Sequence, residues 1–512
     1  MKMVEIKVHA TVIEKSQEMI DELSTSLGKE KISDDKPTRL VYRITHGPEA
    51  LLHESLEDFT PSAIVRPTST KDVQTIVKLA DKYEVPIVPQ GGRTCTYGAE
   101  AMRDCIVIDT ATMDKILEID EGSYRITAEA GVRIVDFHRY LEERGFMCVD
   151  FPTMNKAATL GARAALNGYN KFENRWGSVG CHIKGLEVVL PNGEAVWLGR
   201  GTSKPTKSVV GLNLMDLFIG SRGTLGVITK VTERFIDMPP SYVYGIRAFK
   251  NYEDGLRTYI NLRKPLNAGL LWRSKAYHRW FLSQAVKGML EIDFPDDVEM
   301  LVDYHILGEP DVVEKMERHA IRIMEDHNGF WRDDLPPTDI IGRMHETIEK
   351  YMGMGGLWSD RVINGGMANR IIPLDPMIPD SRLLEYYKEY LKLLHEIEDG
   401  ESYPALADSM KVLNPAGPVP GDVGYSKIWI LLLANWKKWD AETRKEFKVW
   451  FRRHAELALR FNGSITGTHG FLPREMEVEL VRKEVGEKAY EFMKMIKKTI
   501  DPKNIMNPKV RF

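Results

Sequence analysis

The chain has 512 residues, of which 43% are hydrophobic and 28% charged, with a formal net charge of −4. These totals are typical of a globular protein with two or three domains. The charge gives no reason to expect nucleic acid or an anionic membrane as a partner. The opening segment, MKMVEIKVHATVIEK, holds no apolar core of signal-peptide length. The longest apolar run, 428–434, is too short to cross a bilayer and predicts a buried strand.

The four cysteines bear on the compartment and on the cofactor. No two of them are spaced as C-x-x-C, and none belongs to a Cys/His cluster with metal-ligand spacing. This pattern argues against a disulfide scaffold and against an iron–sulfur cluster. We therefore expect a reducing, cytoplasmic location.

Residues 1–60 have a mostly helical pattern. Ile20, Leu23 and Leu27 share one face of a predicted helix. We interpret this stretch as an arm that packs on the domain that follows it.

A strand–helix–strand pattern comes next. Residues 63–65 are a short apolar run, and Ser69 followed by Asp72 is a capping-box pattern that marks a helix start. From Val73 onward, apolar residues recur at helical spacing. Residues 86–89 then predict a second strand.

A polar glycine loop, Gln90-Gly91-Gly92-Arg93-Thr94-Cys95, connects this second strand to a third strand predicted at 105–109. Such a loop can turn several backbone N–H groups toward one anion. It lacks the G-x-G-x-x-G spacing, and a strand rather than a long helix follows it, so it is neither a Rossmann fingerprint nor a Walker loop. Taken alone, the two glycines fit a plain turn as well as a phosphate-binding loop.

The next part of the chain alternates strands with short helices. The pattern predicts a strand, a turn at Gly131 and a helix that ends at Gly145. Residues 158–168 are nearly free of bulky side chains, which allows either a flat ring or another backbone to approach closely. Asn192-Gly193 separates two β-rich runs and predicts a hairpin.

The composition changes at residues 237–240. From there to about residue 460 the chain is rich in Trp, Met and Arg, with its clearest helical patterns at 381–395 and 442–460. The stretch 414–424, NPAGPVPGDVG, has the composition of a linker.

Several stretches resemble one known family. RPTSTKDVQTIVKLADKYEVPIVPQGGRTCTYG resembles the pyrophosphate-binding segment of the FAD-linked oxidase family, which is the vanillyl-alcohol oxidase and p-cresol methylhydroxylase superfamily. Residues 159–177, 185–193 and 220–228 resemble its later flavin-binding segments, and 501–509 resembles its C-terminal pattern. The resemblance covers nearly the whole chain. It is nearest in pattern to the glycolate oxidase flavin subunit and D-lactate dehydrogenase.

The resemblance implies an α+β fold. Its FAD-binding domain would have two parts, a small α/β lobe and a larger α+β lobe, under an α+β cap domain. We expect the FAD-binding domain at 1–240, with the arm at 1–60, and the cap or substrate domain at 241–460. A C-terminal segment, 461–512, would return to the FAD domain.

The resemblance also implies bound FAD. The residues it assigns to the cofactor are Gln90, Gly91, Gly92, Arg93, Thr94, Cys95, Pro152, Thr159, Gly161, Ala162, Asn167, Trp176, Gly177, Gly220, Gly223, Ile228 and Asn507. Some relatives attach FAD covalently through a histidine in the glycine loop, where this chain has Arg93. Non-covalent FAD is therefore expected, and attachment through a cap residue stays open.

The candidate catalytic residues come from the same resemblance. His469, in GTHGF, stands at the family's E-H-G and would take the substrate's hydroxyl proton. Arg361, in GGLWSDR, matches an arginine that holds a substrate carboxylate, and Arg370 is a second candidate. Tyr425, close to Lys427, is a candidate partner for a substrate oxygen, and an ordinary strand residue is the alternative.

Departures from the family predict that no metal is used. D-lactate and D-2-hydroxyglutarate members have a metal site made by H-x-G-D-G-N-x-H and the acid of E-H-G. The counterpart here, 418–427, lacks both histidines, and Thr468 replaces the acid. Asp422 and His469 alone cannot make such a site. A second departure is Arg222, which stands where the family has an acidic residue.

We therefore predict an FAD-dependent dehydrogenase that acts on a CH–OH group, with a 2-hydroxy acid as the leading substrate class. One alternative is oxidation of a phenol or aromatic alcohol in a pocket lined by Trp272, Trp280, Trp358, Tyr425 and Trp429. Another is a flavin-carrying subunit of a larger redox complex. Electrons would leave to a separate acceptor, which would be an iron–sulfur protein, an electron-transfer flavoprotein, a quinone or oxygen. A homo- or hetero-oligomer stays open.

Overall fold

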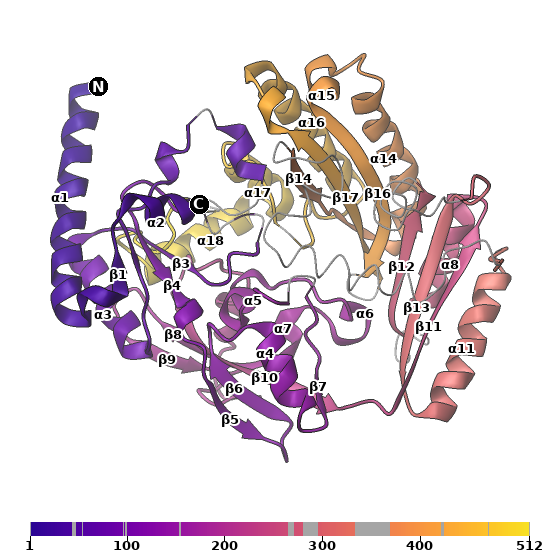
Figure 1. Ribbon diagram of the computed structural model, residues 1–512, viewed down its shortest axis with the longest axis horizontal. Helices are drawn as coiled ribbons and strands as arrows, with labels where there is room; N and C mark the ends of the chain where they lie inside the picture. The colour runs from indigo at the N-terminus through magenta and orange to yellow at the C-terminus, as the bar shows by residue number, and fades with distance from the viewer. Residues whose placement is uncertain are drawn as a thin grey trace.

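The computed structural model describes residues 2–43, 48–53, 55–95, 97, 100–152, 155–264, 271–279, 295–332, 369–420, 424–468 and 470–510. Helices and strands are mixed throughout, which confirms the predicted α+β class. Two halves lie side by side (Figure 1). One holds the N-terminal sheets and the C-terminal helices, and the other holds two sheets formed by residues 241–435.

The small lobe is a four-stranded sheet with the order β1-β2-β4-β3. Its strands are β1 (Ile32–Ser33), β2 (Ala63–Val65), β3 (Ile87–Gln90) and β4 (Ile106–Asp109). Strands β2, β4 and β3 are parallel, and helix α3 (Thr70–Tyr83) connects β2 to β3. The predicted helix start is confirmed, because the Ser69 hydroxyl accepts a hydrogen bond from the Asp72 N–H at 3.2 Å. Helix α1 (Lys2–Leu27) lies against α3, as expected of a packing arm.

The large lobe is a six-stranded sheet with the order β5-β6-β10-β8-β9, in which β7 also pairs with β10. Its strands are β5 (Ile116–Asp120), β6 (Arg125–Glu129), β7 (Phe146–Cys148), β8 (Ile183–Val189), β9 (Ala195–Leu198) and β10 (Val227–Asp237). Helices α4 (Ile134–Glu142) and α5 (Leu160–Leu166) share its hydrophobic core. The predicted hairpin is confirmed: β8 and β9 are antiparallel, and Gly193, at φ +80°, closes the turn by donating to the Leu190 carbonyl.

The cap contains two antiparallel sheets. The first consists of β11 (Ser241–Phe249), β12 (Leu271–His278) and β13 (Met300–Gly308), covered by α8 (Tyr252–Leu262) and α11 (Pro310–Glu325). The second consists of β14 (Asn369–Leu374), β15 (Met377–Pro379), β16 (Met410–Pro420) and β17 (Tyr425–Asn435). The apolar run at 428–434 is confirmed as strand β17, and Ile428, Ile430 and Leu432 are fully buried.

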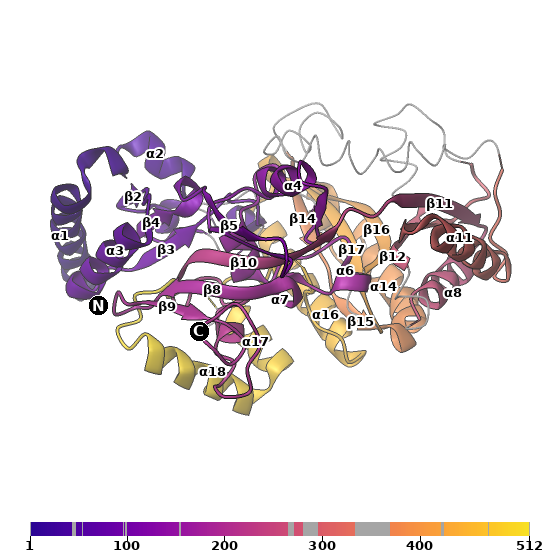
Figure 2. The ribbon, with the colours of Figure 1, turned by 90° about the horizontal axis from the view of Figure 1, so that it is seen from below.

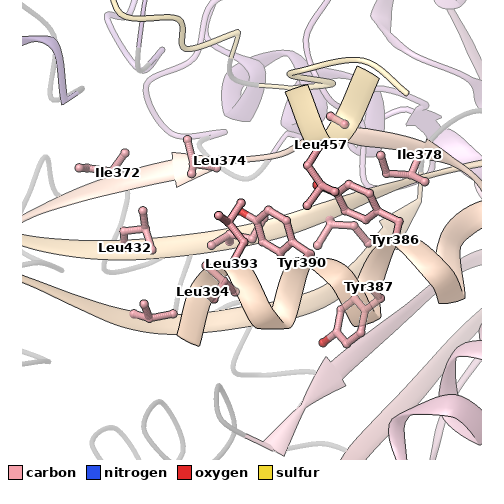
Figure 3. Packing of buried hydrophobic residues seen from close by; sticks show 14 of the residues in the cluster. Ile372, Leu374, Ile378, Tyr386, Tyr387, Tyr390, Leu393, Leu394, Leu432 and Leu457 are labelled. Atoms are coloured by element: carbon pink, nitrogen blue, oxygen red, sulfur yellow. The ribbon is translucent and has the colours of Figure 1, made fainter. Parts of the chain in front are cut away.

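Helices α14 (Leu383–Glu398), α15 (Pro404–Ser409) and α16 (Ala441–Arg460) accompany the second cap sheet. In Figure 3, Tyr386, Tyr390 and Leu394 of α14 lie against β17 and its neighbours in one hydrophobic core. Two helices predicted in this part of the chain are therefore confirmed as α14 and α16.

The linker expectation for 414–424 is wrong over most of its length. Residues up to Pro420 form strand β16, which pairs with one side of β17, while β14 and β15 pair with the other. Proline has no N–H to donate and is tolerated where a ladder is irregular. The β16 register shifts between Val412 and Asn414 and again between Pro415 and Pro418, which accommodates the prolines. Asp422 lies outside the described residues.

The C-terminal segment returns to the small lobe. Helices α17 (Glu477–Val485) and α18 (Glu487–Ile500) lie beside the N-terminal half (Figure 2). Ile87 of β3 donates to the Ile505 carbonyl at 2.8 Å, and the Asn507 N–H donates to the Ile87 carbonyl at 2.9 Å. The tail thus adds a strand-like segment to the free side of β3.

The chain leaves the large-lobe sheet at Asp237 and enters the cap sheet at Ser241. We therefore propose a domain boundary near residue 240 and place the end of the cap near residue 460 as a second proposal. Among the described helices, none combines the length and the apolar character needed to cross a bilayer.

Candidate functional site

A cleft of about 1170 Å³, part of it continuous with open solvent, lies where the two lobes meet the cap. Most of its lining comes from the end of β3 with its glycine loop, residues 158–169 around α5, and residues 222–228. Thr110, Pro152, Trp429 and Thr468 supply the rest. Sequence-distant segments therefore converge on one cavity.

The glycine loop forms one wall of the cleft. Its anchor is β3, where the Gln90 carbonyl accepts a hydrogen bond from the Thr110 hydroxyl at 3.0 Å. Arg93 adopts φ +52° and places its guanidinium 4.1 Å from the centre of the Tyr42 ring. The backbone N–H groups of residues 91–94 donate to no acceptor in the described part of the chain. A row of unused donors beside a cavity is suited to binding an anion.

Both glycines also allow close packing. A Cβ at Gly92 would lie 1.6 Å from the Ala157 carbonyl oxygen, and a Cβ at Gly91 would lie 2.3 Å from Thr159 Oγ1. Only glycine permits this approach of the loop to residues 157–162. The turn and the anion-binding interpretations of Gly91-Gly92 are therefore compatible.

The second wall is made of small side chains on and around α5. Ala158, Gly161, Ala162, Ala165 and Gly168 line the cleft. A Cβ at Gly161 would lie 2.5 Å from the Ala130 Cβ, so this glycine also brings the helix close to the large-lobe sheet. The small residues serve tight packing on one side and leave room for a flat group on the other.

Arg163 reaches the cleft from α5, but its charge is neutralised. Its Nε donates to Asp150 Oδ2 at 2.8 Å, and a second guanidinium nitrogen bonds the other carboxylate oxygen. The same side chain donates to the Tyr169 carbonyl at 2.7 Å. A fixed bidentate pair of this kind positions the 163–169 segment.

Aromatic rings and buried lysines close the cap side. The Trp429 and Tyr169 ring centres are 5.8 Å apart, and both residues line the cleft. The Lys427 ammonium lies 4.5 Å from the Tyr169 ring and pairs with Glu173, and both charged groups are buried. The Lys275 ammonium lies 5.1 Å from the Trp429 ring.

Among the described residues at the cleft, two hydroxyl oxygens and one guanidinium nitrogen have no hydrogen-bond partner. The hydroxyls belong to Thr159, which adjoins Gly91, and to Thr468, which lines the cavity, and the nitrogen is Nε of Arg222. Buried polar atoms of native proteins are almost always satisfied. A polar ligand bound in the cleft would supply the hydrogen-bond partners that these atoms lack.

The structure brings many of the sequence-predicted cofactor residues together. Those that line the cleft are Gln90, Gly91, Arg93, Thr94, Cys95, Pro152, Gly161, Ala162, Gly223 and Ile228. Sequence reasoning did not single out Thr110, Arg163 and Tyr169, which also line it. Tyr169 lies two residues from the predicted Asn167, and that proximity was the available signal.

The other predicted cofactor residues lie outside the lining and have identifiable contacts. Asn167, at φ +49°, accepts a hydrogen bond from the Gly180 N–H at 2.9 Å, and the Gly220 N–H donates to the Ala164 carbonyl at 3.0 Å. The Asn507 amide donates to the Arg222 carbonyl at 2.8 Å. Their hydrogen bonds fix the backbone segments that surround the cleft. Of the remaining ones, Gly92 lies in the loop and packs against Ala157, and Thr159 packs against Gly91. Trp176 and Gly177 end helix α6 (Glu173–Trp176).

The predicted catalytic residues are only partly described. Tyr425 is 44% exposed at the start of β17 and does not line the cleft. Arg370 has its backbone in β14, opposite Ala434, and its side chain is outside the described set. His469 and Arg361 lie outside the described residues, as do Trp280 and Trp358, and Trp272 is described in its backbone alone.

Comparison with known protein families matches residues 61–199 to the FAD binding domain and residues 433–510 to the C-terminal domain of FAD linked oxidases. The chain resembles the FAD-linked oxidase family in both of these domains. It is an FAD-dependent oxidoreductase. The matched segments contain the glycine loop and α5 in one case, and Thr468 with the returning tail in the other.

Individual relatives of this oxidase family cover most of the chain. A probable mitochondrial D-lactate dehydrogenase of Danio rerio is 26% identical over 91% of this chain and 86% of its own. The glycolate oxidase subunit GlcD of Bacillus subtilis is 24% identical over 96% of both chains. Among solved structures, p-cresol methylhydroxylase with bound substrate matches with a TM-score of 0.74 and 17% identity over 97% of both chains, which supports the shared fold.

The residues of the cleft fit FAD. A pyrophosphate needs a set of donors, and the loop offers backbone N–H groups that have no acceptor among the described residues. A flat ring system needs a smooth wall, and α5 offers one made of alanine and glycine. The unpartnered threonine hydroxyls supply further polar contacts.

Proposed function

We propose that this FAD-dependent oxidoreductase oxidises the CH–OH group of a small 2-hydroxy acid. The observation that carries the proposal is that relatives named D-lactate dehydrogenase and glycolate oxidase subunit align with nearly the whole chain, cap included. At the cap side of the cleft, the Lys275 ammonium lies 5.1 Å from the Trp429 ring, whereas the Lys427 ammonium is already paired with Glu173.

FAD would be held by the two walls of the cleft. The N–H groups of residues 91–94 would bind its pyrophosphate, and the small residues of α5 would lie along a flat ring. When bound, FAD supplies the hydride acceptor for the reaction. Non-covalent binding is supported by the loop chemistry: Arg93 is not a nucleophile, and burial raises the pKa of the Cys95 thiol to about 12, so it stays protonated at neutral pH.

His469 remains the proposed base for the hydroxyl proton. His469 lies outside the described residues, and its neighbour Thr468 lines the cleft. Arg361 and Arg370 remain proposed anchors for the substrate carboxylate.

Stopped-flow reduction under anaerobic conditions tests these roles. We expect His469→Asn to slow flavin reduction by about 10²–10⁴-fold with little change in substrate binding. Arg361→Met or Arg370→Met should weaken substrate binding by about tenfold or more. D-lactate and glycolate are the first substrates to compare with p-cresol and vanillyl alcohol. Reduction by phenols alone, with all three variants like wild type, would refute the hydroxy-acid proposal.

Oxidation of a phenol or aromatic alcohol is the second candidate. The observation that favours it is the pair Tyr169 and Trp429 in the cleft lining, together with the fold shared with p-cresol methylhydroxylase. A third candidate function is that of a flavin-carrying subunit. In that case the protein would bind FAD, but neither the hydroxy acids nor the phenols would reduce it.

Partners, metal use and location remain proposals. A separate electron acceptor is proposed because the cysteine pattern provides no iron–sulfur cluster, and a partner subunit is one form it would take. The described residues contain no group of three or more His, Cys, Asp or Glu arranged for a metal. Metal independence stays a prediction, tested by activity after chelation, since Asp422 and His469 lie outside the described set. The free state of all four cysteines supports a reducing, cytoplasmic location.

A further inference from the structure

We infer that Arg222 is an anion-binding residue of the cleft. It would pair with a negatively charged oxygen, either on the reduced flavin or on a bound substrate. The inference builds on the FAD-binding cleft of the proposed function and does not require that the substrate be a hydroxy acid.

Arg222 is buried, with 7% of its surface exposed, and it lines the cavity. Within the described part of the chain, no carboxylate lies within ion-pair distance of its guanidinium, and its Nε has no hydrogen-bond partner. Arg163, on the same cavity, is equally buried but is neutralised by Asp150. A buried charge without a counter-ion is unfavourable unless a ligand provides one.

The other contacts of Arg222 are weak and directional. Its two terminal nitrogens donate to the Tyr97 carbonyl at 3.4 Å and to the Gly470 carbonyl at 3.3 Å. The guanidinium carbon lies 5.3 Å from the centre of the Tyr97 ring. These contacts join the end of the glycine loop to the segment after Thr468, so they hold the guanidinium at the cavity without neutralising it.

The backbone at this position is also unusual. Arg222 adopts φ +57°, a conformation that costs free energy for a residue with a side chain. Its N–H donates to the Ala165 carbonyl at 2.8 Å, and its carbonyl accepts from the Asn507 amide at 2.8 Å. The surrounding structure therefore fixes the direction in which the side chain leaves the backbone.

The chemistry of the reaction supplies an anion. Hydride transfer adds two electrons and one proton to oxidised flavin, so the reduced ring carries one more negative charge, while the substrate's hydroxyl proton goes to the base. A fixed cation beside the ring would favour the reduced form. A substrate carboxylate in the same place would be bound by the same guanidinium.

The experiment uses the FAD-loaded full chain as Arg222→Met and Arg222→Lys, with Arg318→Met as a matched control. Arg318 is an exposed arginine on α11, outside the cleft. One measurement is the midpoint potential of bound FAD without substrate. The other is the dissociation constant of oxalate, a carboxylate that cannot be oxidised as a hydroxy acid, followed by the flavin spectrum.

If the reduced flavin is the partner, Arg222→Met should weaken reduced FAD about tenfold relative to oxidised FAD, which lowers a two-electron potential by about 30 mV. If the substrate is the partner, the potential should stay unchanged and oxalate should bind about tenfold more weakly. Arg222→Lys should keep the midpoint potential and the oxalate affinity close to those of wild type, because lysine keeps the positive charge. Arg222→Met with unchanged potential and unchanged oxalate binding would overturn the inference. The potential needs no substrate, so its outcome is independent of the proposed activity.

Discussion

Glu233 on β10 is a fully buried carboxyl group whose two oxygens find no hydrogen-bond partner among the described atoms. Burial, and then the negative charge of Asp150, raise its pKa well above the usual 4.5. The folded state therefore keeps a proton that the unfolded state releases, so the free energy of unfolding falls as pH rises from 4.5 toward the folded pKa.

Glu233→Gln should remove this loss. We expect the variant to be more stable than wild type at neutral pH, by about 1.4 kcal/mol for each pH unit between 4.5 and the folded pKa, counted no further than neutral pH, and to show no gain near pH 4. Denaturant unfolding of both proteins between pH 4 and neutral pH measures this difference in the free energy of unfolding. The exposed Glu118→Gln serves as the control, and a Glu233→Gln profile parallel to that of wild type would contradict the assignment.

At the residue scale, sequence reasoning found the cleft residues that follow a local pattern. The loop from Gln90 to Cys95 is recognisable because glycine and polar residues stand together after a strand. Arg163 and Tyr169 were missed because their contacts, to Asp150 and Trp429, join segments that are distant in sequence. A resemblance also does not separate residues that line a site from those, such as Asn507, that hold its frame.

At the scale of elements, the glycine loop and α5 form one packed unit. Gly92→Ala would place a methyl group 1.6 Å from the Ala157 carbonyl oxygen, which is part of the backbone and cannot move aside alone. We expect a loss of stability of about 1–3 kcal/mol and FAD binding weakened by at least roughly tenfold. Fluorescence titration with FAD gives the affinity. Gly122→Ala, in a turn where the atom nearest to an added Cβ is Asp120 Oδ1 at 3.7 Å, is the control. Equal FAD affinity in both variants would show that the loop tolerates displacement.

Elements with a strong local signal were predictable. Helix α3 has its cap and apolar spacing in sequence, and the β8–β9 hairpin has its Asn-Gly turn. Strand β16 was not predictable, because its prolines and glycines have the composition of a linker. Pairing with β17 overrides that composition, and the pairing depends on a partner strand and a register that no local pattern contains.

At the scale of the whole molecule, Lys497 holds the tail against the FAD-binding half. Its buried ammonium donates to Asp501 at 2.6 Å and to the Thr224 and Met506 carbonyls at 2.7 Å. Lys497→Met would leave the Asp501 carboxylate buried and unpaired, at a cost of about 3–5 kcal/mol. We expect a lower midpoint of thermal unfolding and faster loss of FAD on dilution. The neighbouring exposed Lys498→Met should behave like wild type, and identical FAD retention in both variants would argue against this role of the tail.

The tail's pairing with β3 has a consequence for how the protein is made. Ile87 hydrogen-bonds residues 505 and 507, so the strand that carries the glycine loop is completed by residues that are translated long after it. While those residues are still inside the ribosome, the nascent chain lacks one side of its flavin-binding lobe. The cofactor is therefore expected to be held stably only after residues 505–507 have left the ribosome. A chain truncated before residue 505 would contain every described residue that lines the cleft but would lose FAD readily.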